Sequence, residues 1–444
     1  MKSVYFLLAA LVFVVLPAIA QESPAPPQPA ASGDAQAGVP QAGKQRKFPV
    51  EIHGFLLGDT AIRTTGERPL KGEGGDFVLG EGRLRLDISG ATGSGQSYFL
   101  VKGDLFHDAI AKEFKADLRE GYVGYTTGPL DLRLGRQIIT WGVGDLFFVN
   151  DVFPKDWESF FSGRPMEYLK PGIDGVRVRH SGRSLNVEFV AIPFFTPDNL
   201  PSASRFFFFD PFAAVPDQRE EKPASRLANT EVALRVYRSL AGFDVSVYAY
   251  RGYWRTPGVR PDAQNSPASA TRFYPQLSSY GASGQRGVLG GVLSLETGYY
   301  DSRQDRRGND PAVPNSQWRF LAGYQRELAQ DFTAGVQAYT ELMEKHDAYR
   351  DSLPAGILRQ DRIREVISTR LTKLLKYQTW TLSLFAAYSP ADKDYFLQPE
   401  VSHKVIDSLN LSLGANVFGG KSEATFFGQF RKSDNVFFRV RFDF

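Results

Sequence analysis

The sequence predicts an all-β protein, a transmembrane antiparallel up-and-down β-barrel of about 18 strands, with a count of about 16 left open. Two observations predict this fold class. From Phe48 onward, apolar and polar residues alternate in run after run, and helical periodicity never persists for more than about two turns. Short and long connections also alternate between these runs, as they do when one rim of a barrel carries tight turns and the other carries longer loops.

The first 20 residues are predicted to form a secretory signal peptide. Lys2 precedes a short apolar run, Val4–Leu16, and the sequence Ala-Ile-Ala that ends at Ala20 provides a cleavage site. The apolar run is too short for a membrane-spanning helix, which needs about 20 residues. Residues 21–47 are rich in Pro, Ala and Gln and are predicted to form a disordered periplasmic spacer, so the barrel is expected over residues 48–444.

Composition argues against several classes of function. The 444 residues include no cysteine, so there is no disulfide framework, lipid-bearing cysteine or haem-attachment motif. A formal net charge of +3 is too small to indicate a nucleic-acid partner. The five histidines lie far apart and none has metal-ligand spacing, so we expect no metal, no other cofactor and no catalytic site.

The alternating runs have the period of a β-strand. Residues 83–88, 130–135 and 380–384 show it clearly, with leucine, isoleucine or tryptophan at every second position and mostly polar or charged residues between them. A period of two places the two sets on opposite faces of a strand. In a membrane-spanning barrel, the apolar face meets lipid and the polar face lines the lumen.

Eight short and nine longer connections join these runs, which is the number that 18 strands require, with both termini at the rim of short turns. A soluble protein of several β domains would have no reason to alternate loop lengths in this way. The predicted short connections are Ala91–Gly95, Thr127–Gly128, Ser181–Arg183, Leu240–Ala241, Ser283–Arg286, Leu328–Gln330, Leu375–Lys376 and Val405–Asp407.

The final run, Asn435–Phe444, is the most regular. Apolar residues occupy every even position from Val436 to Phe444, and three of the four odd positions from Phe437 to Asp443 are charged. Such a strand resembles the last strand of bacterial outer-membrane β-barrels, which serves in that class as the assembly signal. The resemblance implies location in the bacterial outer membrane, contact with its lipid, and recognition of this strand by the barrel-assembly machinery.

Two long connections are expected to have special roles. Gly142–Lys170 follows the fifth predicted strand, and in porins that loop folds inward and narrows the pore. We therefore predict a constriction loop here, with a surface flap as the alternative. Its charged residues are Asp145, Asp151, Asp156, Arg164 and Glu167. Thr196–Leu227 contains four consecutive phenylalanines, Phe206–Phe209, which are expected to pack into the barrel mouth or a subunit contact.

The residues expected to line the lumen are nearly balanced in charge, but the basic ones gather near the predicted constriction loop. Guanidinium groups bind anions bidentately and stay charged, so a basic wall would favour anions. The alternative is a lattice of ion pairs that stiffens the wall. The pore-lining candidates are Arg83, Arg85, Arg133, Arg177 and Arg179.

Two motifs carry a further resemblance. Leu134-Gly135-Arg136-Gln137 followed by Trp141-Gly142, and then Gly172-Ile173-Asp174-Gly175-Val176-Arg177, resemble a pattern in porin-like outer-membrane barrels of the alginate-export type and related families. The resemblance covers about the middle third of the barrel and the C-terminal strand. In the alginate exporters, a pore lined by Arg and Lys passes a polyanion.

The sequence thus predicts a porin for passive diffusion of small hydrophilic solutes, with a mild preference for anions. The alternatives are a polymer-export conduit of the alginate-export type and a sheath that scaffolds partner proteins. An outer-membrane phospholipase is disfavoured, because the adjacent residues His180 and Ser181 would face opposite ways on a strand. A homotrimer and a single barrel both remain open.

Overall fold

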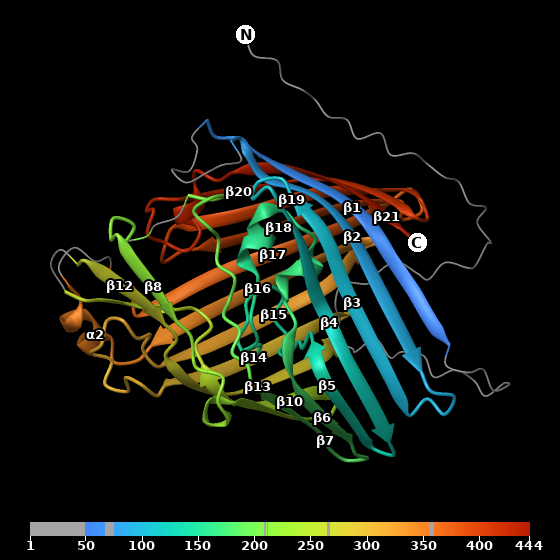
Figure 1. Cartoon of the computed structure of the whole chain (residues 1–444), viewed down its shortest axis with the longest axis horizontal. Coiled ribbons are helices and arrows are strands. Elements are labelled where there is room, and N and C mark those ends of the chain that lie inside the picture. The colour runs from blue at the N-terminus through green and yellow to red at the C-terminus, as the bar shows by residue number, and fades with distance from the viewer. Residues whose placement is uncertain (1–48, 67–74, 208–209, 211, 264–266, 355–358) are drawn as a thin grey trace, which may run out of the picture. The chain divides into compact units, whose positions relative to one another are not determined.

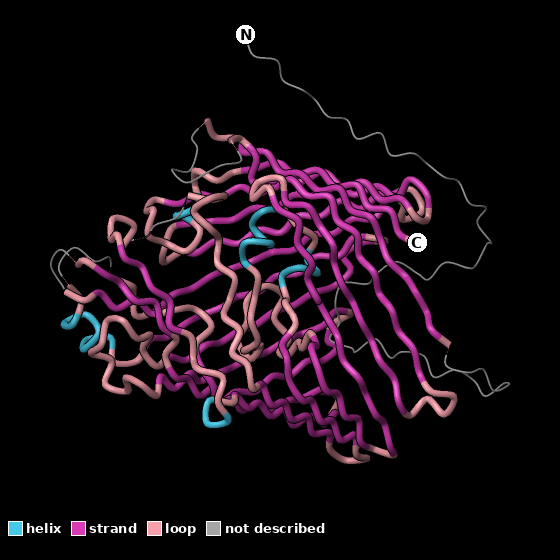
Figure 2. Tube along the Cα trace, in the orientation of Figure 1, coloured by secondary structure: helices cyan, strands magenta, loops and turns pink. Residues whose placement is uncertain are grey.

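The computed structural model of the chain describes residues 49–66, 75–207, 210, 212–263, 267–354 and 359–444. The expected signal peptide, 1–20, and the expected disordered segment, 21–47, lie outside these described residues. Strands dominate the described part of the chain (Figure 2). No helix among the described residues is long and apolar enough to cross a membrane.

Eighteen strands form one antiparallel sheet in which each strand pairs with its neighbours along the chain (Figure 1). The first strand pairs both with the second and with the last, so the sheet closes on itself. This is the predicted up-and-down barrel, with 18 strands rather than 16. The barrel strands are β1 (Val50–Arg63), β2 (Phe77–Ala91), β3 (Ser97–Asp108), β4 (Glu113–Thr127), β5 (Leu130–Gln137), β6 (Ile173–Ser181), β7 (Asn186–Ile192), β9 (Glu231–Leu240), β10 (Phe243–Tyr253), β13 (Gln276–Val288), β14 (Gly291–Ser302), β15 (Gln317–Ala329), β16 (Phe332–Met343), β17 (Ile363–Leu375), β18 (Trp380–Ser389), β19 (Asp394–Ile406), β20 (Leu409–Gly420) and β21 (Asn435–Asp443).

The two faces of the wall differ as the alternation predicts. On β5, Leu132 and Leu134 are 42% and 56% exposed on the outer face, whereas Asp131, directly before Leu132, is 7% exposed on the inner face. On β21, Phe438 points outward and is 43% exposed, while its neighbour Phe437 is 1% exposed. The barrel therefore presents an apolar outer surface and a largely polar inner one, the arrangement of a barrel in lipid.

One predicted turn is misplaced. Strand β13 continues through Ser283–Arg286, which pairs with Leu293–Glu296 on β14, and the chain turns instead at Leu289 and Gly290. Both turn residues have positive φ, 50° and 74°, as a two-residue hairpin turn that follows the twist of its strands requires. Polar residues occur both in turns and on the lumen side of a strand, so the polarity of this stretch does not distinguish the two.

The wall is unequal in height. β5, β6 and β7 have 8, 9 and 7 residues, whereas β2 and β4 have 15 each. Long connections rise from this low sector, and a small second sheet of β8 (Asp217–Glu221), β11 (Gly258–Pro261) and β12 (Ser269–Phe273) forms among them. The described helical elements are short and lie in connections: α1 (Trp157–Ser162), η1 (Met166–Leu169), η2 (Leu227–Asn229), α2 (His346–Ser352) and η3 (Gly428–Phe430).

Candidate functional site

The candidate site is the connection between β5 and β6, residues 138–172, which we call the β5–β6 loop. It follows the fifth strand, as predicted, and carries α1 and η1. Asp156 begins α1 because its carboxylate accepts a hydrogen bond from the Ser159 amide at 2.7 Å. Gly163 ends the helix in a left-handed conformation, φ 89°, that favours glycine. These caps fix a helix of six residues, which turns its phenylalanines toward the barrel wall.

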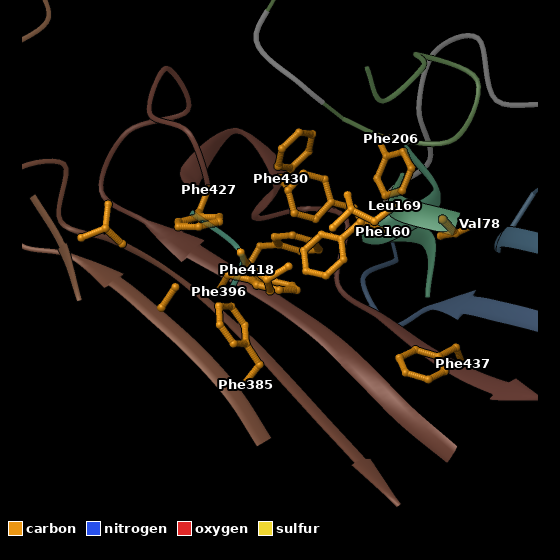
Figure 3. Packing of buried hydrophobic residues seen from close by; sticks show 14 of the residues in the cluster. Val78, Phe160, Leu169, Phe206, Phe385, Phe396, Phe418, Phe427, Phe430 and Phe437 are labelled. Atoms are coloured by element: carbon orange, nitrogen blue, oxygen red, sulfur yellow. The ribbon is translucent and has the colours of Figure 1, made fainter. Parts of the chain in front are cut away.

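An aromatic cluster attaches α1 to one side of the wall (Figure 3). Phe161 is 1% exposed, and its ring centroid lies 5.7 Å from that of Phe396 on β19 and 5.3 Å from that of Phe418 on β20. It also lies 4.9 Å from Phe430, which belongs to the connection between β20 and β21. Phe206, from the connection between β7 and β9, lies 6.0 Å from Phe430 and is 1% exposed. Three connections therefore meet around α1.

The predicted packing of Phe206–Phe209 is confirmed for Phe206; Phe208 and Phe209 lie outside the described residues. Neighbouring Arg205 is buried and holds this connection in place. Its guanidinium ion-pairs with Asp108 at the end of β3 and lies 3.2 Å from the Glu158 carboxylate in α1.

A second apolar cluster attaches the loop to the opposite sector of the wall. Trp141 and Phe153 of the loop pack against Tyr248 on β10, with ring centroids 5.1 Å apart within the loop pair and 5.7 Å between Trp141 and Tyr248. The Trp141 indole N–H donates to Glu188 on β7 at 3.2 Å. Each apolar contact removes loop surface from water, so both clusters hold the loop against the wall.

A single inward carboxylate, Glu296 on β14, holds the backbone of the loop. It accepts hydrogen bonds from the amides of Val143, Gly144 and Asn150 at 3.0, 3.2 and 2.8 Å, and from the Asn150 side chain at 2.9 Å. Gly142 suits this position because its φ of 79° favours glycine, and a Cβ there would lie 2.5 Å from a Glu296 carboxylate oxygen. Hydrogen bonds to a buried charge are among the stronger ones in proteins.

The basic residues predicted to line the pore lie in networks with carboxylates. Arg83 lies between Glu81 and Asp104, at 2.9 and 2.8 Å. Arg85 also binds Asp104, and it reaches the loop at Glu167, 3.3 Å away. The β5–β6 loop also contacts β2 through Arg164, whose guanidinium lies 2.5 Å from the Glu81 carboxylate.

The remaining three predicted arginines are arranged in the same way. Arg177 lies 2.9 Å from Glu188, and Arg133 and Arg179 lie 3.4 and 4.0 Å from Asp131. The arrangement matches the ion-pair lattice more closely than a row of bare cations.

The charged residues predicted in the constriction loop contact three parts of the structure. Asp145 binds Arg370 on β17 at 2.5 and 3.1 Å, while Arg164 and Glu167 bind the β2 network described above. Asp156 serves as the helix cap. Asp151 is buried within the loop, 3.1 Å from Lys155 and 2.7 Å from Lys170.

The pH response of the loop follows from Asp151. Burial by itself would raise the pKa of this carboxyl, but Lys155 and Lys170 outweigh burial and hold the pKa below its ordinary value of 3.8. A group with a lowered pKa contributes stability that is present above the ordinary pKa and is lost as the pH falls through the lowered value. We expect the hold that Asp151 gives the loop to persist from neutral pH to about pH 4 and to be lost below it.

Open-channel current noise in a planar bilayer, recorded from about pH 7 to pH 3, measures this loosening. Asp151→Asn should already be noisy at neutral pH and should lose the acid-dependent increase. Identical pH profiles for the two proteins would show that Asp151 does not hold the loop.

A chamber of about 240 Å³ lies between the β5–β6 loop and strands β13–β19. Aromatic side chains supply much of its lining, and charged side chains from several elements supply most of the rest. The aromatic lining includes Phe148, Trp157 and Phe426, and the charged lining residues are Asp151, Lys155, Asp198, Arg255, Arg319, Glu341 and Arg364. Of these, the sequence predictions included only Asp151 as a site residue.

Sequence reasoning missed the residues that anchor the loop. Glu296 lies on the inner face by alternation, but nothing in the sequence links it to a loop about 150 residues earlier. A usable signal was present in Phe385, Phe396 and Phe418, which are apolar at inward positions where a barrel is normally polar. Such positions indicate that another part of the chain covers them.

No protein-family model matches this sequence, and no curated protein matches it. Solved structures of similar fold do exist. The OccK2 (OpdF) structure of Pseudomonas aeruginosa, solved in complex with glucuronate, is 9% identical, with a TM-score of 0.55, and the match covers 90% of this chain and 99% of that one. A BenF-like porin from Pseudomonas fluorescens Pf-5 is 10% identical, with a TM-score of 0.54 and coverage of 89% and 98%. OccK5 (OpdH) of Pseudomonas aeruginosa is also 10% identical, with a TM-score of 0.54 and coverage of 89% and 97%.

At these identities the likeness establishes the fold. The chain is a porin-like β-barrel of the kind found in the bacterial outer membrane. A closed barrel leaves no unpaired sheet edge, and its apolar outer face is suited to lipid, so the architecture is that of a membrane-spanning barrel.

Proposed function

We propose that the chain is an outer-membrane channel for passive diffusion of small hydrophilic solutes, narrowed by the β5–β6 loop. The observation that carries the proposal is the attachment of this loop to opposite sectors of the wall. Phe161 contacts β19 and β20, whereas Trp141 contacts β10 and Val143 contacts β14. A loop that contacts β10, β14, β17 and β20 in turn lies against the inner wall over much of its circumference, and it would leave a passage smaller than the barrel.

The charge arrangement supports a weak preference for anions rather than a strong one. Arg83, Arg85 and Arg177 each lie within ion-pair distance of a carboxylate, so much of their charge is offset. Offset charges also favour a small-solute channel over a conduit for a polyanion, because a polyanion would require a track of uncompensated cations.

Ion selectivity in a salt gradient tests this proposal. In the intact protein we expect steady open conductance with a small reversal potential on the anion side. Arg177→Gln combined with Arg179→Gln removes two cations and leaves Glu188 and Asp131 behind, so the reversal potential should move to the cation side.

Arg238→Gln is the matched control, because Arg238 is exposed and pairs with Val245 on the outward-facing register of β9 and β10. It should leave selectivity unchanged. A barrel that inserts but never conducts would overturn the channel proposal, and a shift in the control equal to that in the double variant would overturn the role of the two arginines.

A further inference from the structure

The chamber beside the β5–β6 loop has an aromatic side. Phe148 and Trp157 of the loop lie with ring centroids 6.0 Å apart, and Phe426 of the β20–β21 connection lies 6.0 Å from Trp157. Phe426 is 39% exposed, and Phe148 and Trp157 are half-buried, so part of each ring stays open. Partly open aromatic rings can stack against the flat apolar face of a ligand.

The other side of the chamber carries a row of ion pairs. Arg319 on β15 lies 3.5 Å from Glu341 on β16, and Glu341 lies 3.6 Å from Arg364 on β17. Arg364 also pairs at 2.7 Å with Asp392, which follows β18 and lies outside the chamber lining. The side chains of Arg319, Glu341 and Arg364 are 18%, 23% and 24% exposed, so each keeps hydrogen-bonding capacity toward a ligand.

With Asp392, which pairs with Arg364 from outside the lining, the row alternates two guanidinium groups with two carboxylates. The other charged lining residues are also balanced, with Lys155 and Arg255 against Asp151 and Asp198. A carboxylate ligand would be attracted by Arg319 and Arg364 but repelled by Glu341 and Asp392, and a cation would meet the reverse. Ligand hydroxyl groups both donate and accept hydrogen bonds, so they match a surface that alternates donors and acceptors. Charged donors and acceptors make stronger hydrogen bonds than neutral ones.

The two sides lie next to each other, because the Arg364 guanidinium lies over the Phe426 ring at 5.4 Å. A ligand in the chamber would therefore meet an aromatic surface and a neutral hydrogen-bonding row together. The ligand chemistry that fits both is a ring with an apolar face and a rim of hydroxyl groups.

We propose that the chamber is a binding site for a neutral saccharide on its way through the channel. The aromatic rings of Phe148, Trp157 and Phe426 stack on the sugar face, and Arg319, Glu341 and Arg364 pair with its hydroxyl groups. This inference rests on the proposed channel function and specifies the class of solute that the channel retains.

The test measures blocking of the ion current by glucose and, as a carboxylated counterpart, by glucuronate in planar bilayers. In the intact protein, glucose should interrupt the current at lower concentration than glucuronate. Phe426→Ala should weaken the glucose block roughly tenfold, as expected for loss of an aromatic contact. Phe189→Ala is the matched control, since Phe189 is 40% exposed on β7 and lies outside the chamber. Glucose should block the current of this variant as strongly as that of the intact protein.

Asp392→Asn provides a second variant that changes charge without altering a barrel strand. It leaves two guanidinium groups with one carboxylate but removes no side chain from the chamber lining, so the glucuronate block should strengthen roughly fivefold while the glucose block stays unchanged. Stronger block of the intact protein by glucuronate than by glucose would overturn the proposal. Steady conductance with no glucose block would also overturn it while leaving the channel function standing, whereas the absence of any conductance would overturn the channel function itself.

Discussion

Glu296→Ala is expected to release the middle of the β5–β6 loop and to give a larger, noisier conductance. The substitution removes four hydrogen bonds: those from the amides of Val143, Gly144 and Asn150, and one from the Asn150 side chain, which also donates to the Thr297 carbonyl at 3.1 Å. At about 1 kcal/mol or more for each lost bond, the loop loses roughly 4 kcal/mol of anchoring. The effect is large because one carboxylate serves all four donors.

Single-channel recording measures this change directly, and Glu365→Ala is the matched control. Glu365 is exposed, next to buried Val366 on β17, and should leave the conductance unchanged. If Glu296→Ala conducts with the same amplitude and noise as the intact protein, Glu296 is not the anchor of the loop. Glu296→Gln should be intermediate, because an amide retains one of the two acceptor oxygens.

Phe161→Ala should cause the largest loss of stability among single substitutions in the loop, about 3–5 kcal/mol. Phe161 is 1% exposed and contacts aromatic rings from β19, β20 and the β20–β21 connection. Its removal opens a cavity that several strands cannot close, because their positions are set by the hydrogen bonds of the barrel.

Urea unfolding in detergent micelles, followed by tryptophan fluorescence, measures the loss. Phe320→Ala is the control, since Phe320 is 43% exposed on the outer face of β15 and should cost far less in a micelle. Equal midpoints for the two variants would contradict a structural role for the aromatic cluster.

The barrel could be predicted from the sequence because each strand is marked by an alternation of apolar and polar residues within its own segment. A period of two in residues 83–88 or 130–135 indicates a strand and its faces without knowledge of the neighbouring strands, and the structure confirms those strands. The count of 18 followed from the alternation of connections. The misplaced turn at Ser283–Arg286 shows the limit, because polarity on the lumen side of a strand and polarity in a turn look alike.

The site could be predicted only in part, because it depends on contacts between residues that lie far apart in the sequence. The position of the loop after the fifth strand is confirmed by the order of the strands. The ion pairs of Arg83 and Arg177 depend on which strands become neighbours, and so could be named only as an alternative. The contacts of Asp145 with Arg370 and of Val143 with Glu296 join residues 225 and 153 positions apart. The narrowing of the pore by the loop, and a preference for anions, remain predictions.

The attachment of the β5–β6 loop to several barrel strands has a mechanical consequence. A hollow cylinder resists squeezing mainly through the stiffness of its wall, and this wall is lowest at β5, β6 and β7. A segment fastened to β10, β14, β17 and β20 in turn acts as an inner brace that ties these strands together. Lateral pressure from the surrounding bilayer would then deform this braced part of the cross-section least, so the passage would keep its size there as the membrane thickens or stretches.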